Sequence, residues 1–303
     1  MNLYTLDLNF QNVPQTIASY LIVGPDGPVL VETGPGSTLT NLLAELQRHG
    51  FKPEDVRHVL VTHIHLDHAG AAGWWAQHGA QVYVHHVGAP HLINPDRLLQ
   101  SATRIYGDKM DTLWGDFLPS PAERVTAVYD GDVIDVAGLQ FTAIESPGHA
   151  RHHHVYRLGD IAFTGDAAGI HLPDMPMIDV PAPPPEFELE VWEATVDRLL
   201  AENFTTLYPT HFGAVNNPAA HLTALKGLMG ETAVYIKAQL DAGLERDDLV
   251  DAYNHWNRTR ARQAGMNDMA IHQYETSNPW YMSVDGISRY WRKREKNAQS
   301  GSR

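Results

Sequence analysis

One stretch of the chain decides the fold, and it reads His58-Val59-Leu60-Val61-Thr62-His63-Ile64-His65-Leu66-Asp67-His68. An apolar run passes directly into three histidines and one aspartate within six residues. In an extended chain His63, His65 and Asp67 share one face, because side chains repeat every two residues. His68 has the opposite parity, so one short turn can offer ligands to two neighbouring sites. Imidazole and carboxylate donors favour zinc, manganese or iron over copper(I).

Three further polar residues follow apolar runs in the same way, namely His149, Asp166 and His211. A glycine lies near each of them and lets the backbone approach a ligand closely. Taken singly, each is more typical of a hydrogen-bonded loop histidine or a turn aspartate. Taken together they indicate one site, because the ends of neighbouring strands meet at one edge of an α/β sheet. The candidate metal ligands are His63, His65, Asp67, His68, His149, Asp166 and His211.

The rest of the chain alternates short apolar runs with helical periodicity, which predicts a mixed α/β fold of two sheets with helices outside. Strands are expected at 19–23, 28–31, 58–61, 81–84 and 205–208, with four or five more between 124 and 164. Helices are expected from Ser37 as N-cap to Gly50, through Trp74 and Trp75, at 187–201, from Pro218 behind Asn217, at 245–263 and within 277–297. Residues 92–117 are expected to form an irregular helical lid. The six prolines of 173–185 predict a rigid, extended loop.

The composition excludes several classes of function. The 303 residues carry 22 Lys+Arg against 36 Asp+Glu, a net charge of -14, which disfavours binding to nucleic acid or to an anionic membrane. The absence of cysteine excludes disulfides, thiolate metal sites and cysteine nucleophiles. Neither a signal peptide nor a membrane span is recognisable, so a cytoplasmic protein is expected. The expected partner is a small-molecule substrate, and the sequence does not decide whether the chain forms a homo-oligomer.

With these motifs in this order, the sequence resembles the metallo-β-lactamase-fold superfamily, in which an HxHxDH motif precedes single His, Asp and His ligands. The matching segments are Thr62–His68, Ser146–His149, Phe163–Asp166 and Pro209–His211. The resemblance implies a four-layer αββα sandwich over residues 1–215 and a C-terminal helical region over 216–303. It also implies a dinuclear site, with His63, His65 and His149 on one metal, Asp67, His68 and His211 on the other, and Asp166 bridging. Glu32, where the family usually has Asp, is expected to support a ligand.

The resemblance also narrows the activity. Glyoxalase II-like thioesterases and lactonases keep all seven ligands, whereas cysteine-type zinc β-lactamases need a cysteine and flavodiiron proteins have Glu where this chain has His65. The prediction is a dinuclear metal-dependent hydrolase that uses a metal-bridging hydroxide on a small ester, thioester or lactone. Two divalent ions are expected, zinc first, with manganese or iron as alternatives. Asp67 is the expected catalytic residue, which takes the proton of the water. A mononuclear iron enzyme similar to persulfide dioxygenases is the alternative, because those enzymes share the same ligands.

Substrate selection is expected from segments outside the shared core, namely the lid, the proline-rich loop and the C-terminal helices. The candidate pocket residues are Tyr106, Trp114, His171, Met175 and Met177. A glutathione thioester would need cationic partners for its carboxylates. Arg258, Arg260 and Arg262 are available, but their alternate spacing scatters them around a helix.

Overall fold

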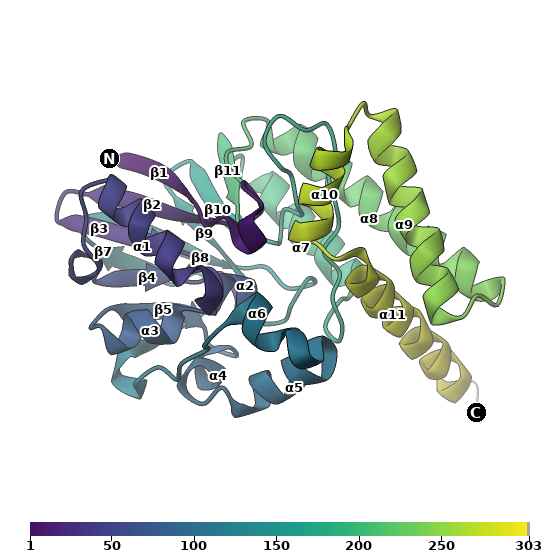
Figure 1. The fold of residues 1–303 in the computed structure, drawn as a ribbon, viewed down its shortest axis with the longest axis horizontal. Coiled ribbons are helices and arrows are strands. Elements are labelled where there is room, and N and C mark those ends of the chain that lie inside the picture. The colour runs from purple at the N-terminus through teal and green to yellow at the C-terminus, as the bar shows by residue number, and fades with distance from the viewer. Residues whose placement is uncertain (302–303) are drawn as a thin grey trace.

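Two β-sheets form the centre of the molecule (Figure 1). The computed structural model describes residues 1–301; residues 302–303, the last two of the predicted C-terminal region, lie outside the described part. The six strands of the first sheet follow the order β1 (Asn2–Asp7), β2 (Ala18–Gly24), β3 (Gly27–Val31), β4 (His58–Leu60), β5 (Gln81–His85) and β6 (Val125–Val128). The five strands of the second sheet follow the order β11 (Thr206–Pro209), β10 (Ile161–Gly165), β9 (His154–Leu158), β8 (Leu139–Glu145) and β7 (Val133–Val136).

The directions of the strands determine where the candidate ligands leave the sheets. In the first sheet, β1 to β3 are antiparallel and β3 to β6 are parallel, with Val31 paired to Leu60. In the second sheet only β10 and β11 are parallel, and Gly165 pairs with Pro209. The residues that follow β10 and β11 therefore leave the sheet at the same edge, as the sequence predicted for Asp166 and His211.

Helices cover the first sheet on its outer side. They are α1 (Leu39–Arg48), α3 (Ala72–Gln77), α4 (Ala89–Ile93), α5 (Asp96–Tyr106) and α6 (Met110–Trp114). Leu42 of α1 and Trp75 of α3 are fully buried in one hydrophobic cluster with Leu30 and Val59 of the sheet. Amphipathic helices gain most of their stability from such packing. Segment 92–117 is helical, as predicted, because it contains α5 and α6.

A second cluster lies between the sheets and extends to the helices on the other side. Tyr20 of β2 meets Phe163 of β10 with ring centroids 5.4 Å apart. The same cluster takes in Trp192 of α7 (Leu189–Ala201) and Leu222 of α8 (Pro218–Asp241). The sheets are thus flanked by helices on either side, which confirms the predicted four layers.

The C-terminal helices gather at one end of the sandwich, in the green to yellow part of the chain (Figure 1). They are α8, α9 (Arg246–Gln263), α10 (Asp268–Ser277) and α11 (Trp280–Gly301). Tyr253, Tyr274 and Ile287 from these helices belong to the same cluster as the second sheet. The division at residues 215 and 216 stays a prediction. No helix within residues 1–301 is long and apolar enough to cross a membrane.

Three local features differ from the sequence prediction or were absent from it. Strand β1 was not predicted, because most of its side chains are half-buried and its place is fixed by pairing with β2. Helix α10 was not predicted either. Ser37 was expected to cap α1, but the helix begins at Leu39 after a 3₁₀ turn over 36–38, and the Ser37 hydroxyl donates instead to the carbonyl of Leu113.

Candidate metal centre

All seven predicted ligands converge on one place between the sheets. His63 and His65 lie in the loop after β4, and Asp67 and His68 lie in the short helix α2 (Leu66–Ala69). The other three follow β8, β10 and β11. Three groups of side chains each bring their ligand atoms within 4.8 Å of one another: His63, His65 and His149; His63, His68 and Asp166; and Asp67, His68 and His211.

The first ligand set consists of three histidines. His65 Nδ1 lies 2.9 Å from His63 Nε2 and 3.0 Å from His149 Nε2. His149 Nδ1 donates to the carbonyl of Pro181 at 2.7 Å, and since a carbonyl can only accept, this bond leaves Nε2 free to bind a ligand. Burial and the neighbouring imidazoles lower the pKa of both His63 and His65 well below the usual value. These rings are therefore held neutral, the form that binds metal.

The second ligand set combines a carboxylate with two histidines. Asp67 Oδ2 lies 3.4 Å from His211 Nε2 and 3.6 Å from His68 Nε2. His211 Nδ1 donates to the carbonyl of Thr16 at 2.6 Å, so its Nε2 also faces the site unprotonated when a ligand is bound. Burial opposes ionisation of Asp67, but His68 and His211 lower its pKa to about 2.

Asp166 lies between the two sets. Its Oδ2 is 3.3 Å from His149 Nε2 in the first set. Its Oδ1 is 3.5 Å from His68 Nε2 and 3.7 Å from His211 Nε2 in the second set. One carboxylate thus turns one oxygen toward each set.

Glu32 supports His68 from behind, as the sequence predicted. It is 1% exposed, and its Oε1 accepts a hydrogen bond from the backbone N–H of Thr62 at 3.1 Å. Its Oε2 lies 3.5 Å from His68 Nδ1, on the opposite side of the ring from Asp67 and Asp166. The ring is therefore held between carboxylates on both sides.

The donor set fits divalent metal ions. Both ring nitrogens of His68 and Oδ1 of Asp166 are buried and have no hydrogen-bond partner among the described residues. Leaving such groups unpaired costs about 1–3 kcal/mol each. Burial lowers the pKa of His68, but Asp67, Asp166 and Glu32 outweigh it and raise the pKa well above the usual value. Carboxylates that favour a proton on His68 also favour a cation in its place.

The comparison with known proteins decides the family. Residues 13–211 match the model of the metallo-beta-lactamase superfamily. The chain belongs to this superfamily. Its members are generally hydrolases and typically bind divalent metals.

Individual relatives differ in how much of the chain they share. A metallo-beta-lactamase fold-containing protein of Sulfurisphaera tokodaii is 24% identical over 231 residues, covering 75% of this chain and 84% of the relative. The crystal structure of a metallo-beta-lactamase family protein of Thermus thermophilus has a TM-score of 0.70 at 21% identity and covers 97% of this chain and 94% of that one. An atrochrysone carboxyl ACP thioesterase of Aspergillus fumigatus is 30% identical over 142 residues, which is 46% of this chain and 35% of the relative.

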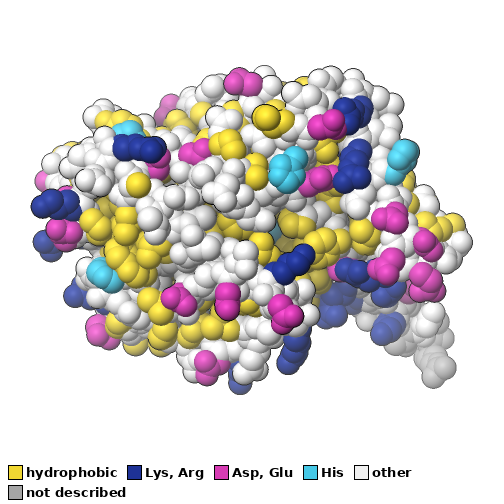
Figure 2. Space-filling model, viewed as in Figure 1, with side chains coloured by type: hydrophobic (Ala, Val, Ile, Leu, Met, Phe, Trp, Pro, Cys, Tyr) yellow, Lys and Arg dark blue, Asp and Glu magenta, His cyan; other side chains and the backbone are white. Residues whose placement is uncertain are grey.

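A pocket of about 300 Å³ opens onto the candidate metal centre of this superfamily member. Figure 2 shows apolar side chains around a hollow near the middle of the face, with a cationic side chain at its edge. Tyr106 and Trp114 line the pocket, as predicted, together with apolar residues of α5 and α6. The junction of α10 and α11 forms the facing wall with Tyr281 and Met282. The centre thus faces an apolar chamber made by the lid and the C-terminal helices.

Three other predicted pocket residues are elsewhere. Met177 is buried in the core that includes the C-terminal helices, and Met175 packs against that core. His171 stacks edge-on with His221, at a centroid distance of 5.5 Å, and does not line the pocket. The cause is the backbone pairing of Ile170 with Asp179, which turns this part of the loop away from the chamber.

The arginines proposed for glutathione carboxylates also fail to reach the pocket. Arg258 pairs with Glu275 at 2.7 Å, and Arg262 pairs with Asp268. Arg260 lies over the ring of Trp256. None of the three lines the pocket, and α9 lies at the outer edge of the C-terminal helices (Figure 1).

Sequence reasoning did not assign His153 to the site, and it missed two pocket arginines. His153 Nε2 accepts a hydrogen bond from the backbone N–H of Asp166 at 3.2 Å, and its ring stacks on His63 at 4.7 Å. Arg151 forms two hydrogen bonds to Glu186 Oε1, so its charge is neutralised. Arg97 of α5 lines the pocket and forms no ion pair within residues 1–301. Arg97 could not be recognised from the sequence, because it lies among other polar residues of its helix.

Proposed function

We propose that the chain is a dinuclear metal-dependent hydrolase that cleaves a small ester, thioester or lactone at the base of the pocket. One observation carries the proposal, namely the position of Asp166 with one oxygen toward His149 and the other toward His68 and His211. A carboxylate between two ligand sets is what a pair of ions needs as a shared ligand.

The proposed ligands are those of the two sets, with Asp166 shared. Zinc is the first choice, since nitrogen and carboxylate donors without sulfur suit zinc, and manganese and iron are the alternatives. Divalent ions bound here would supply a water of lowered pKa and would polarise a carbonyl oxygen. The side chains of the protein would accept the proton of the water and bind the substrate.

Asp67 is the proposed catalytic residue. Its side chain is 22% exposed and lines the pocket, whereas that of Asp166 is 5% exposed. An oxygen of Asp67 can therefore reach a water that attacks a substrate in the pocket and can accept its proton. His211 and His68 both lie near Oδ2 of this carboxylate and hold it in place.

The lining of the pocket supports the proposal that the protein recognises the acyl group of its substrate. Leu98, Ala102, Ile105 and Leu113 give the lid wall an apolar surface. The free guanidinium of Arg97 offers a partner for an anionic group of the substrate. The similarity to a carboxyl ACP thioesterase supports a thioester among the candidate substrates.

Two measurements test the proposal. Elemental analysis of protein purified without chelator or metal-affinity resin is expected to give two equivalents of zinc, manganese or a mixture. The same protein is expected to hydrolyse members of a panel of p-nitrophenyl esters, S-lactoylglutathione and acyl-homoserine lactones faster than the blank without enzyme.

Two outcomes would overturn it. A protein that holds two metals and turns over no ester, thioester or lactone is not this hydrolase. One equivalent of iron, with oxygen consumed in the presence of glutathione persulfide, would establish the mononuclear alternative instead.

A further inference from the structure

The hydroxyl of Ser283 on α11 bonds the proline-rich loop on both sides of Pro181. The side chain of Ser283 is fully buried. Its Oγ donates to the carbonyl of Val180 at 2.9 Å and accepts from the backbone N–H of Ala182 at 3.2 Å. One hydroxyl therefore fixes the residues before and after Pro181.

The carbonyl of Pro181 is the group that holds His149. It accepts from His149 Nδ1 at 2.7 Å. Since His149 Nε2 belongs to the first ligand set, 3.0 Å from His65 Nδ1, the direction of this carbonyl sets where Nε2 points. Ser283 and His149 thus contact the same short segment, residues 180–182, from opposite sides.

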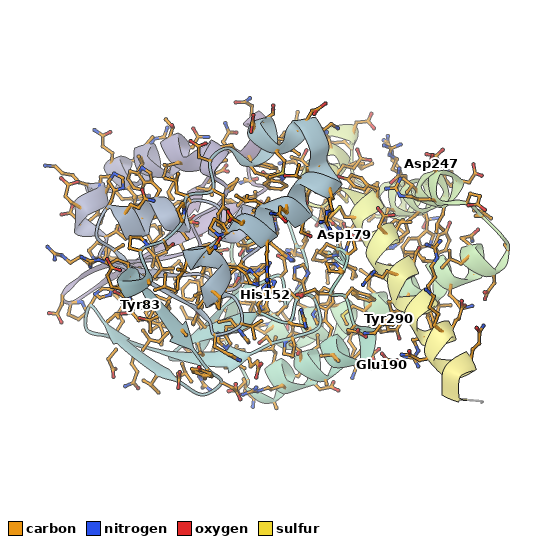
Figure 3. All side chains as sticks on the ribbon, turned by 90° about the horizontal axis from the view of Figure 1, so that it is seen from below. Tyr83, His152, Asp179, Glu190, Asp247 and Tyr290 are labelled. Atoms are coloured by element: carbon orange, nitrogen blue, oxygen red, sulfur yellow. The ribbon has the colours of Figure 1, made fainter. Side chains whose placement is uncertain are left out.

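A buried carboxylate anchors the segment one residue earlier. Asp179 Oδ2 accepts from Asn278 Nδ2 at 2.9 Å and from Trp280 Nε1 at 2.8 Å, and its Oδ1 accepts from the backbone N–H of Val180 at 2.9 Å. Trp280 is the first residue of α11 and Asn278 lies just before it, at the end of α10, and Figure 3 shows Asp179 beside the helix. The loop is therefore tied to α11 at 179, 180 and 182.

A glycine permits this contact. Gly286 lies three residues after Ser283, on the same face of α11. A Cβ at Gly286 would overlap the carbonyl of Ala182. The helix can therefore lie directly on the backbone of the loop only because this position has no side chain.

We propose that Ser283 is a positioning residue of the metal centre, which acts through the Pro181 carbonyl to orient His149 for the first metal. The inference rests on the metal binding proposed above. It places a determinant of metal affinity in α11, outside residues 13–211 that match the superfamily. Partners that orient a ligating histidine typically change metal affinity by about 10- to 100-fold, and Ser283 acts one step further away.

The test is a zinc titration of the metal-depleted, full-length protein in competition with a chelator, for wild type and Ser283→Ala. The variant is expected to weaken one binding step by about tenfold and leave the other unchanged, the lower end of the range for orienting partners. The matched control is Ser288→Ala, also buried on α11, because the Ser288 hydroxyl has no hydrogen-bond partner among the described residues. This control should bind both ions as wild type does. The spectrum of the cobalt-substituted protein should change in Ser283→Ala alone.

Several results would overturn the proposal. Unchanged affinity in a folded Ser283→Ala protein would do so, and so would equal weakening of both steps in Ser283→Ala and Ser288→Ala. If Ser283→Ala does not fold, Trp280→Phe removes one donor to Asp179 and is expected to weaken the same step by a smaller factor; no effect there overturns the proposal. Because metal affinity is measured directly, a wild type that binds two ions but cleaves no ester would contradict only the hydrolase proposal.

Discussion

Two buried carboxylates mark two different regions of the molecule. As whole residues, Asp166 in the candidate metal centre is 3% exposed and Asp179 under α11 is 1% exposed. Both oxygens of Asp179 accept hydrogen bonds from neighbouring groups of the protein. Oδ1 of Asp166 has no such donor among the described residues and faces histidine nitrogens.

The pKa shifts follow the same division. Burial raises the pKa of Asp179, and its hydrogen bonds only partly offset this. Burial acts on Asp166 in the same direction, but His68, His149 and His211 outweigh it and hold the pKa well below the usual value. A buried carboxylate whose oxygens all accept hydrogen bonds from the protein stabilises the fold. A buried carboxylate that stays charged and has an oxygen without a donor is a candidate ligand-binding group.

The largest expected effect comes from Asp166→Asn. The amide keeps the shape and loses the charge that both ligand sets share, so hydrolysis should fall on the order of 10³-fold or more, as when one member of a catalytic unit is lost. Metal content should fall below two equivalents. Rates on the best ester of the panel and elemental analysis check this. Two bound metals with the wild-type rate would contradict the role given to Asp166.

Asp179→Ala should act on stability instead. It leaves the side-chain donors of Asn278 and Trp280 buried without an acceptor, which should lower the free energy of unfolding by about 2–4 kcal/mol. Urea unfolding at saturating zinc measures it. Asp174→Asn is the control, because Asp174 is exposed in the same loop and asparagine tolerates its left-handed backbone. A loss no greater than that of the control would show that the hydrogen bonds of Asp179 are not needed.

Chelation should affect the region around Asp166 far more than the region around Asp179. Removing the metals should lower the free energy of unfolding by about 2.7 kcal/mol for each ion that had been present at a hundred times its Kd. Asp166→Asn should lose most of this metal-dependent stabilisation, whereas Asp179→Ala, which only loosens the support of one ligand, should keep most of it. Thermal unfolding with and without chelator distinguishes the two. Equal metal dependence in both variants would remove the distinction drawn above.

The smallest expected effect is that of Arg97→Ala on substrate choice. An exposed ion pair contributes about 0.2–1 kcal/mol, so KM for an ester with a terminal carboxylate should rise by a factor of about 1.4 to 5. KM for a neutral ester of equal length should not change. Arg104→Ala on the same helix is the matched control, since Arg104 lines a different surface hollow. A rise for both esters would assign Arg97 to the structure of the lid rather than to recognition.

The convergence of the seven candidate ligands was predictable because its information is local. Each ligand follows an apolar strand within a few residues, and the parallel pairing of β10 and β11 then brings Asp166 and His211 to one edge. The pocket was only partly predictable. Tyr106 and Trp114 lie on helices whose apolar faces could be recognised, whereas Met175 and Met177 are turned inward by a backbone pairing that no periodicity signals. Ser283 could not be found from the sequence, because its partners lie about a hundred residues away.

The carbonyls of Pro181 and Thr16, which accept hydrogen bonds from His149 and His211, have a consequence for biosynthesis. Thr16, which holds His211, leaves the ribosome 195 residues before its partner, and Ser283 emerges 103 residues after Val180. At 5–20 residues per second, roughly 10–40 s separate His68 from Ser283. A nascent chain therefore presents the HxHxDH stretch to cellular metals well before the remaining ligands and their supports exist. All seven candidate ligands have been made once synthesis has passed His211, but the support proposed for His149 is complete only after α11. A chain arrested before α11 is therefore expected to bind metal more weakly than the full-length protein.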